Sequence, residues 1–137
     1  MSQNIFGIAT VVLIVIGLIF IGIWFKSQQL PGNSLSAYQT QESKSTVSVL
    51  LTPTNFDGEN FHVDIKLDTH SVELNQFDLK KITTLEFNGN SFKPIVAPEL
   101  QGHHSSGELI FKTNEEPKIF KIIITGFPEV PIRTFEW

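Results

Sequence analysis

An uncharged apolar run constrains this chain more than any other feature of its sequence. Residues 5–25 read IFGIATVVLIVIGLIFIGIWF, 21 residues without a charged side chain. At about 1.5 Å of rise per residue, a helix of this length spans about 31 Å, the thickness of a bilayer's hydrocarbon core. Trp24 suits an aromatic interface anchor, and Lys26 marks the return to water. We therefore predict a single transmembrane anchor over residues 1–26, which binds the lipid bilayer through residues 5–25.

A cleaved signal peptide is the alternative explanation of this run. A signal peptide carries a basic n-region and a shorter apolar stretch of roughly 7 to 15 residues, and residues 1–4 contain no basic side chain. Residues 34–36, ahead of Ala37, form a weak cleavage site. An uncleaved anchor fits the length of the run better, and cleavage stays open.

The orientation of the anchor rests on few charges. Lys26 follows the run, and by the positive-inside rule it favours a cytoplasmic C-terminal part, although one lysine carries little weight. A short N-terminus ahead of a long span is also how extracytoplasmic β-domains are commonly displayed. We expect a single-pass membrane protein whose C-terminal domain is extracytoplasmic.

The composition changes after the anchor. Residues 27–45 are rich in Gln, Ser, Gly, Asn and Pro, and residues 30–33, Leu-Pro-Gly-Asn, break any helical continuation. We predict a flexible linker over residues 27–45. A random coil of about 19 residues has an average end-to-end distance of about 25 Å.

Apolar residues alternate with polar ones beyond the linker, which indicates β-strands. The alternation is clearest in residues 61–68, where Phe61, Val63, Ile65 and Leu67 share one face. Asn88-Gly89 predicts a tight hairpin turn. The predicted strands cover residues 46–51, 61–68, 82–87, 91–96, 107–111, 118–124 and 132–137.

About seven short strands without a helical period favour an all-β fold, an antiparallel β-sandwich of immunoglobulin-like kind over residues 46–137. A small barrel is the alternative. The chain has no Cys, so its 12 Phe are the expected core material, and a disulfide framework, a thiolate nucleophile and a Cys-ligated metal are excluded. A formal net charge of −4 argues against nucleic-acid binding.

Two polar clusters interrupt the apolar alternation, in residues 68–71 and in residues 101–107. Together they hold three of the four histidines, and the loops of a sandwich can bring both clusters to one end. Imidazole nitrogen suits copper or zinc, and an aspartate can add an oxygen ligand. The alternative is that these side chains only satisfy loop backbone groups through hydrogen bonds. The candidate metal ligands are Asp68, His70, His103 and His104.

Catalysis is not indicated by the remaining polar residues. Ser105 with His104 or His70 offers a nucleophile and a base, but the sequence has no Gly-x-Ser-x-Gly elbow, and we expect no enzyme activity and no catalytic or cofactor-binding residues. His62 alternates with apolar residues, so we expect an exposed strand side chain without a role.

The last predicted strand, residues 132–137, alternates to its end, so we expect it to be integral to a sheet. Arg133, Thr134 and Glu136 are either cross-strand polar partners or part of a binding edge. Pro131 would blunt such an edge.

Three stretches resemble a known group of proteins: residues 67–74 with Asp-Thr-His-Ser, residues 102–111 with Gly-His-His-x-x-Gly, and residues 133–137. The group consists of small, single-span prokaryotic membrane proteins with an extracytoplasmic β-domain and no assigned activity. The resemblance covers residues 46–137. It implies these domain boundaries and draws attention to the histidines.

The leading hypothesis is a membrane-anchored binding or structural module that presents a loop end and a sheet edge to a protein partner at the membrane surface. The alternative is an extracytoplasmic copper- or zinc-binding accessory domain that uses His70, His103 and His104. The sequence specifies neither the partner nor the oligomeric state.

Overall fold

The computed structural model describes residues 38–137. The predicted anchor over residues 1–26, the possible cleavage site and residues 27–37 of the predicted linker therefore lie outside the described residues. Within residues 38–137, no helix has the length and apolar character needed to cross a membrane.

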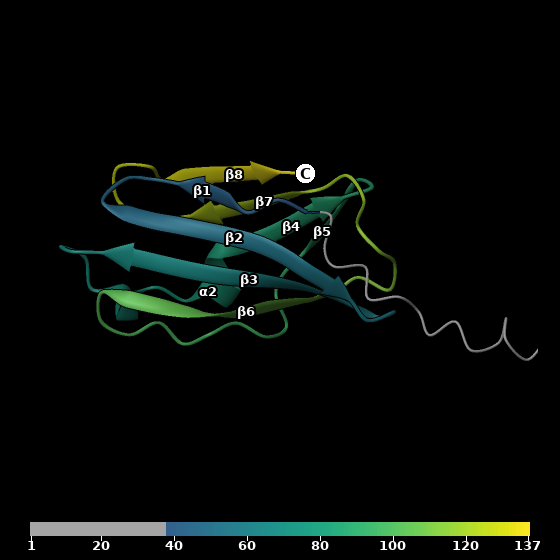
Figure 1. Cartoon of the computed structure of the whole chain (residues 1–137), viewed down its shortest axis with the longest axis horizontal. Coiled ribbons are helices and arrows are strands. Elements are labelled where there is room, and N and C mark those ends of the chain that lie inside the picture. Colours follow the sequence, from purple (N-terminus) through teal and green to yellow (C-terminus); the bar gives the residue numbers. More distant parts are fainter. Residues whose placement is uncertain (1–37) are drawn as a thin grey trace, which may run out of the picture. The chain divides into compact units, whose positions relative to one another are not determined.

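Two antiparallel four-stranded sheets make up the described part of the chain (Figure 1). Sheet A has the order β1-β2-β3-β6, and sheet B has the order β5-β4-β7-β8. The prediction of an antiparallel all-β fold is confirmed. The strands of sheet A are β1 (Gln41–Ser43), β2 (Val47–Phe56), β3 (Asn60–Thr69) and β6 (His104–Lys112). Those of sheet B are β4 (Thr83–Phe87), β5 (Asn90–Phe92), β7 (Lys121–Thr125) and β8 (Ile132–Glu136).

The core forms from the alternating apolar side chains of both sheets. Phe61, Val63, Ile65 and Leu67 of β3 are at most 2% exposed, which confirms the predicted inward face of this strand. These four side chains belong to one core cluster with the inward-facing side chains of sheet B. The largest fully buried side chains are Phe61, Phe111 and Phe127, which matches the expected use of phenylalanine.

Turns and short helices join the strands. Asn88 and Gly89 both have positive φ, +49° and +75°, and connect the paired residues Phe87 and Asn90, so the predicted tight hairpin is confirmed. A 3₁₀ turn (Leu74–Gln76) and α2 (Leu79–Ile82) follow β3. Helices of three and four residues are too short to give a helical period in the sequence.

Strand β1 shows that the ordered domain begins before residue 46, inside the predicted linker. The strand is polar and lies at an edge of sheet A, so its sequence has no apolar alternation to mark it. The Gln41 side-chain amide hydrogen-bonds both the N–H and the C=O of Glu136 in β8. The Gln41 side chain thus takes the place of a backbone hydrogen-bond pair between two strands, and it joins sheet A to sheet B.

Arg133 makes the second connection between these strands. Its side chain points inward and is 2% exposed. One Nη group donates to the carbonyl oxygen (2.9 Å) and the hydroxyl (3.2 Å) of Ser43, and the other donates to the hydroxyl of Ser45 (2.6 Å). The guanidinium also lies 5.6 Å from the ring centroid of Phe127. Arg133 therefore fastens β8 to β1, and the expectation that the last strand is integral to the fold is confirmed.

The loops gather at two ends of the domain (Figure 1). We call one the entry end, because the described chain begins there at Tyr38, whose hydroxyl donates to the carbonyl of Pro117 (2.7 Å). The turn between β2 and β3, the turn between β4 and β5, and residues 113–120 lie at this end. The far end carries residues 70–78, 99–103 and 126–131.

Candidate functional site

A groove lies on the outer side of sheet B at the entry end, between the β4–β5 hairpin and the end of β8. Ile119 stands in its wall with 85% of its surface exposed, more than any other large apolar side chain in residues 38–137. We call this feature the Ile119 groove. Its lining residues are Glu86, Phe87, Gly89, Asn90, Ser91, Ile119, Phe120, Lys121, Glu136 and Trp137.

Aromatic rings form a fixed floor for the Ile119 groove. Phe120 and Trp137 stack with centroids 5.1 Å apart and an angle of 17° between their planes. Phe120 also packs edge-on against the buried Phe61, at 5.0 Å. The indole N–H of Trp137 donates to the carbonyl of Gln39 at 2.8 Å. Because these contacts fix the rings from below, the floor is preformed.

The rim of the Ile119 groove is polar and carries an excess of negative charge. Lys121 forms a salt bridge with Glu86 at 3.0 Å and lies opposite Glu136 in the strand register. Two carboxylates therefore flank one ammonium group. An apolar centre within a polar rim is typical of a surface that binds another protein.

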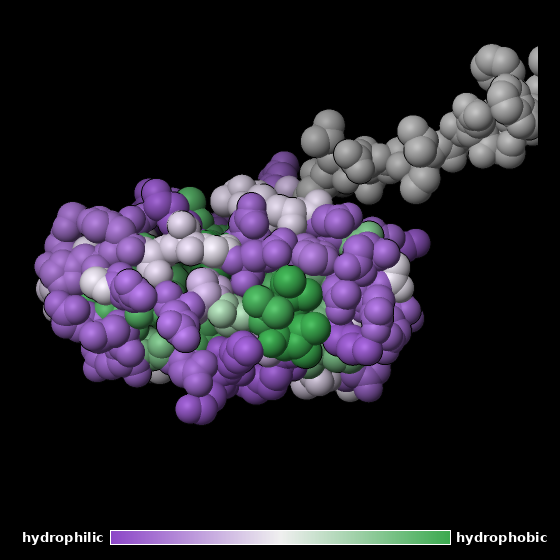
Figure 2. Space-filling view, turned by 90° about the horizontal axis from the view of Figure 1, so that it is seen from below, coloured by the Kyte–Doolittle hydropathy of each residue, from purple (hydrophilic) through white to green (hydrophobic). Residues whose placement is uncertain are grey.

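A second apolar surface borders β6. Ile95 and Val96 are 49% and 45% exposed. The N–H groups of both residues donate to the carbonyl of Ile110, at 2.8 and 3.4 Å, and the N–H of Ile110 donates to the carbonyl of Val96 at 3.0 Å. Figure 2, seen from the side of β6, shows an apolar patch on this face. This segment uses the outer backbone groups of Ile110, so it obstructs the edge of β6 for strand addition.

Three of the four predicted metal ligands lie together at the far end. Asp68 of β3 and His104 of β6 are cross-strand partners, and Asp68 Oδ1 lies 2.8 Å from His104 Nδ1. The rings of His70 and His104 meet edge to face with centroids 6.0 Å apart. The hydrogen bond with His104, opposed by burial and supported by the charge of Lys66, lowers the pKa of Asp68.

His103 does not join this group. Its Nε2 lies 3.0 Å from Glu73 Oε1, and its carbonyl accepts from the N–H of Thr69 at 2.9 Å. Adjacent residues of an extended chain point to opposite sides, which separates His103 from His104. Among the described residues, no three His, Asp or Glu side chains converge on a position that could hold a metal ion.

The alternation of side chains along β6 also separates Ser105 from His104, the nucleophile and base of the weak hydrolase candidate. Ser105 follows His104 in β6, so its side chain points to the other face of sheet A. The hydrogen-bonding nitrogen Nδ1 of His104 faces Asp68. The structure therefore directs these two side chains away from each other.

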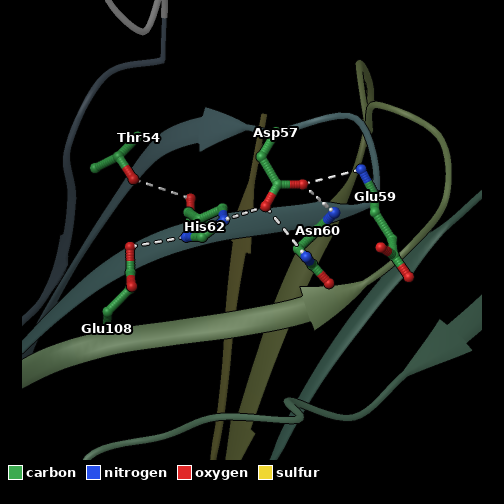
Figure 3. Close-up of polar contacts among 6 residues, drawn as sticks. All are labelled: Thr54, Asp57, Glu59, Asn60, His62 and Glu108. Carbon is green, nitrogen blue, oxygen red and sulfur yellow. Dashed lines mark hydrogen bonds and ion pairs between the residues drawn. The ribbon is translucent and has the colours of Figure 1, made fainter.

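His62 lies between two carboxylates on the outer face of sheet A (Figure 3). Its Nδ1 is 2.9 Å from Glu108 Oε1, and its Nε2 is 3.2 Å from Asp57 Oδ2. A carboxylate accepts hydrogen bonds, so both nitrogens donate only when the imidazole is protonated. Burial disfavours the charged ring, but the hydrogen bonds and charges of Asp57 and Glu108 outweigh it and raise the pKa of His62 above its ordinary value of 6.5.

Asp57 also organises the turn between β2 and β3. Its Oδ1 accepts from the backbone N–H groups of Glu59 (2.9 Å) and Asn60 (2.7 Å), and its Oδ2 accepts from the Asn60 side chain at 3.1 Å (Figure 3). The hydrogen bonds from the backbone of Asn60 and Glu59 are the main cause that holds the pKa of Asp57 far below its ordinary range. His62 thus ties this turn to β6.

The alternation of the sequence predicts an outward side chain without a role for His62. The outward direction is correct, but the side chain is only 18% exposed because Asp57 and Glu108 enclose it. Asp57 is five residues away in the turn, and Glu108 is 46 residues away in β6. The proximity of Asp57 was visible in the sequence, whereas that of Glu108 depends on the pairing of β3 with β6.

Comparison of the chain with protein-family models, with curated proteins and with solved structures finds no match. Its function is therefore inferred from its residues and their geometry.

Proposed function

We propose that this protein is a membrane-anchored binding module that holds a protein partner in the Ile119 groove. The observation that carries the proposal is the 85% exposure of Ile119 beside a preformed aromatic floor. Covering an exposed isoleucine with a partner contributes about 1.5–3 kcal/mol. Binding energy at protein interfaces concentrates in such apolar centres, where surrounding polar groups exclude water.

The rim of the groove specifies the chemistry of the partner. Glu86 and Glu136 outweigh Lys121, so the partner is a polypeptide segment that places a basic side chain beside an apolar one. Complementary charge at the rim raises the association rate and disfavours acidic partners.

We place this partner at the membrane surface, because the sequence predicts a transmembrane anchor over residues 1–26 ahead of the domain that carries the groove.

The strand order supports an immunoglobulin-like fold for this module. In that fold, strands A, B, E and D form one sheet, and strands C, F and G form the other, which gains C′ in variable-type domains. The orders β2-β3-β6 and β5-β4-β7-β8 correspond to A-B-E and C′-C-F-G, without a strand D beside β6 among the described residues. Strand β1 is then an addition at the edge beside A.

Site-specific photocrosslinking tests the proposed function. A photoreactive residue replaces Ile119 in the full-length protein in native membranes, and in a matched variant it replaces Ile132, which is 65% exposed and begins β8 toward the far end. We expect one discrete crosslinked protein from position 119 and none from position 132.

A second variant tests the role of the rim. Glu136→Lys reverses one rim charge and should weaken the crosslink at position 119, while Lys80→Glu, at an exposed position of α2 outside the groove, should leave it unchanged. The absence of a discrete crosslink at position 119, or equal crosslinking at 119 and 132, would refute the proposal.

A further inference from the structure

The outer face of sheet A carries a second potential site at the far end, separate from the Ile119 groove. Asp68 and His104 face each other across β3 and β6, and His70 follows β3 by one residue. Because alternate residues of a strand share a face, Asp68 and His70 point to the same side of the sheet. His104 has 66% of its side chain exposed, and His70 is also exposed, so both rings can be approached from solvent.

The hydrogen bond between Asp68 and His104 determines which nitrogen of His104 is available. Asp68 accepts at 2.8 Å from Nδ1, so Nδ1 carries the proton and Nε2 of the neutral ring presents a lone pair. A carboxylate in this position orients histidine ligands in many metal sites and raises their basicity. Asp68 is thus suited to position His104 rather than to bind the ion itself.

The separation of the two rings fits a shared ion. A metal lies about 2.0–2.1 Å from each coordinating nitrogen and so about 3.2 Å from each ring centroid, which places the centroids of two rings on one ion about 4.5–6.4 Å apart, depending on the angle at the metal. The centroids of His70 and His104 are 6.0 Å apart. Asp68 holds His104 in place, so the exposed His70 would supply the adjustment, by rotating about its side-chain bonds until one of its nitrogens faces the same point as Nε2 of His104.

We propose that His70 and His104 bind one Cu²⁺ or Zn²⁺ ion through their ring nitrogens, with Asp68 as a positioning residue and water in the remaining coordination positions. Two imidazoles and water form a nitrogen and oxygen site, for which Cu²⁺ binds more tightly than Zn²⁺. This proposed ligand set differs from the one expected from the sequence, since His103 faces Glu73 and Asp68 faces Nδ1 of His104.

The positive charge of Lys66 opposes the binding of a cation at this site. Lys66 Nζ lies 3.5 Å from Asp68 Oδ2, so an ammonium group stands beside the carboxylate that positions His104. Replacing Lys66 with Ala should therefore strengthen binding. The site has two protein ligands on an open surface, and we expect it to exchange its ion rather than retain it through purification.

Titration of the full-length protein in detergent micelles with Cu²⁺, and separately with Zn²⁺, tests the proposal after treatment with a chelator. Calorimetry gives the stoichiometry and affinity, and electron paramagnetic resonance of the Cu²⁺ form reports the coordinating nitrogens. We expect one ion per chain and two imidazole nitrogens. His70→Ala and His104→Ala should each weaken binding at least tenfold, and Asp68→Asn should weaken it about 10–100-fold.

His103→Ala is the matched control, because His103 is adjacent in sequence and bonded to a different carboxylate. It should bind copper as the unmodified protein does. Unchanged affinity in His70→Ala and His104→Ala, an equal loss in His103→Ala, or no binding of either ion would each overturn the proposal. Thermal melting of the metal-free variants establishes that each is folded.

Discussion

Raising the pH should lower the folding stability of the domain, because His62 loses its proton. The folded-state pKa of His62 lies above its ordinary value of 6.5. Its contribution to stability is therefore fully present below about pH 6.5 and is lost as the pH rises through the folded-state pKa. Asp57 acts in the opposite sense: its pKa is lowered, so its contribution is lost only in acid, as the pH falls toward the folded-state pKa.

The size of the alkaline loss follows from exposure and geometry. Hydrogen bonds to charged groups contribute about 1.5–3 kcal/mol when shielded, and exposed ion pairs contribute about 0.2–1 kcal/mol. The side chain of His62 is 18% exposed, but its two partners are 40% and 43% exposed, so solvent screens the interaction. We expect the protonated ring to contribute about 1 kcal/mol to the free energy of unfolding. For a domain of this size, this corresponds to about 4–8 °C in Tm.

Thermal melting between pH 5.5 and pH 9 measures this loss against His62→Gln, which cannot gain the proton. The difference in Tm between the two proteins should shrink by about 4–8 °C across this range. The reasoning is refuted if the unmodified protein and His62→Gln show the same pH dependence.

Three further substitutions test how the fold is held together. Arg133→Met removes the donors to Ser43 and should lower the free energy of unfolding by about 2 kcal/mol, as measured by urea denaturation; an unchanged transition would contradict the role of Arg133 in fastening β1. Gly107→Ala would place a Cβ 2.6 Å from Pro98 Cβ and should cost about 1–3 kcal/mol in the same assay, whereas exposed Ser106→Ala should be near neutral. Tyr38→Phe loses one hydrogen bond and should cost about 0.5–1.5 kcal/mol, with no effect arguing against an ordered chain at the entry end.

The alternation of apolar and polar residues predicted most of the fold, because a strand with one buried face has an apolar residue at every second position. Residues 61–68 were found within one residue at each end, and Asn88-Gly89 gave the hairpin, since positive φ at both turn positions favours this pair. Strand β1 was missed because its residues are polar and its place depends on Gln41 and Arg133 reaching between sheets. Such partners are 90 or more residues apart, and no local pattern encodes them.

The candidate sites were predicted less well, for a related reason. The sequence pointed to His70, His103 and His104 as a group, yet the extended chain turns His103 toward Glu73. The enclosure of His62 required the pairing of β3 with β6. The Ile119 groove was not predicted, because a single exposed isoleucine next to Phe120 resembles an ordinary strand residue in the sequence.

Tyr38 determines how the domain responds to mechanical force. Any pull on the chain that precedes it reaches the domain at this residue, whose ring packs edge-on against Phe61 of sheet A and against Phe120 beside sheet B. Its hydroxyl is bonded to Pro117 in a third segment. The load is therefore divided between both sheets before it reaches β1, so the contacts of Tyr38 protect the edge strand from being pulled off sheet A.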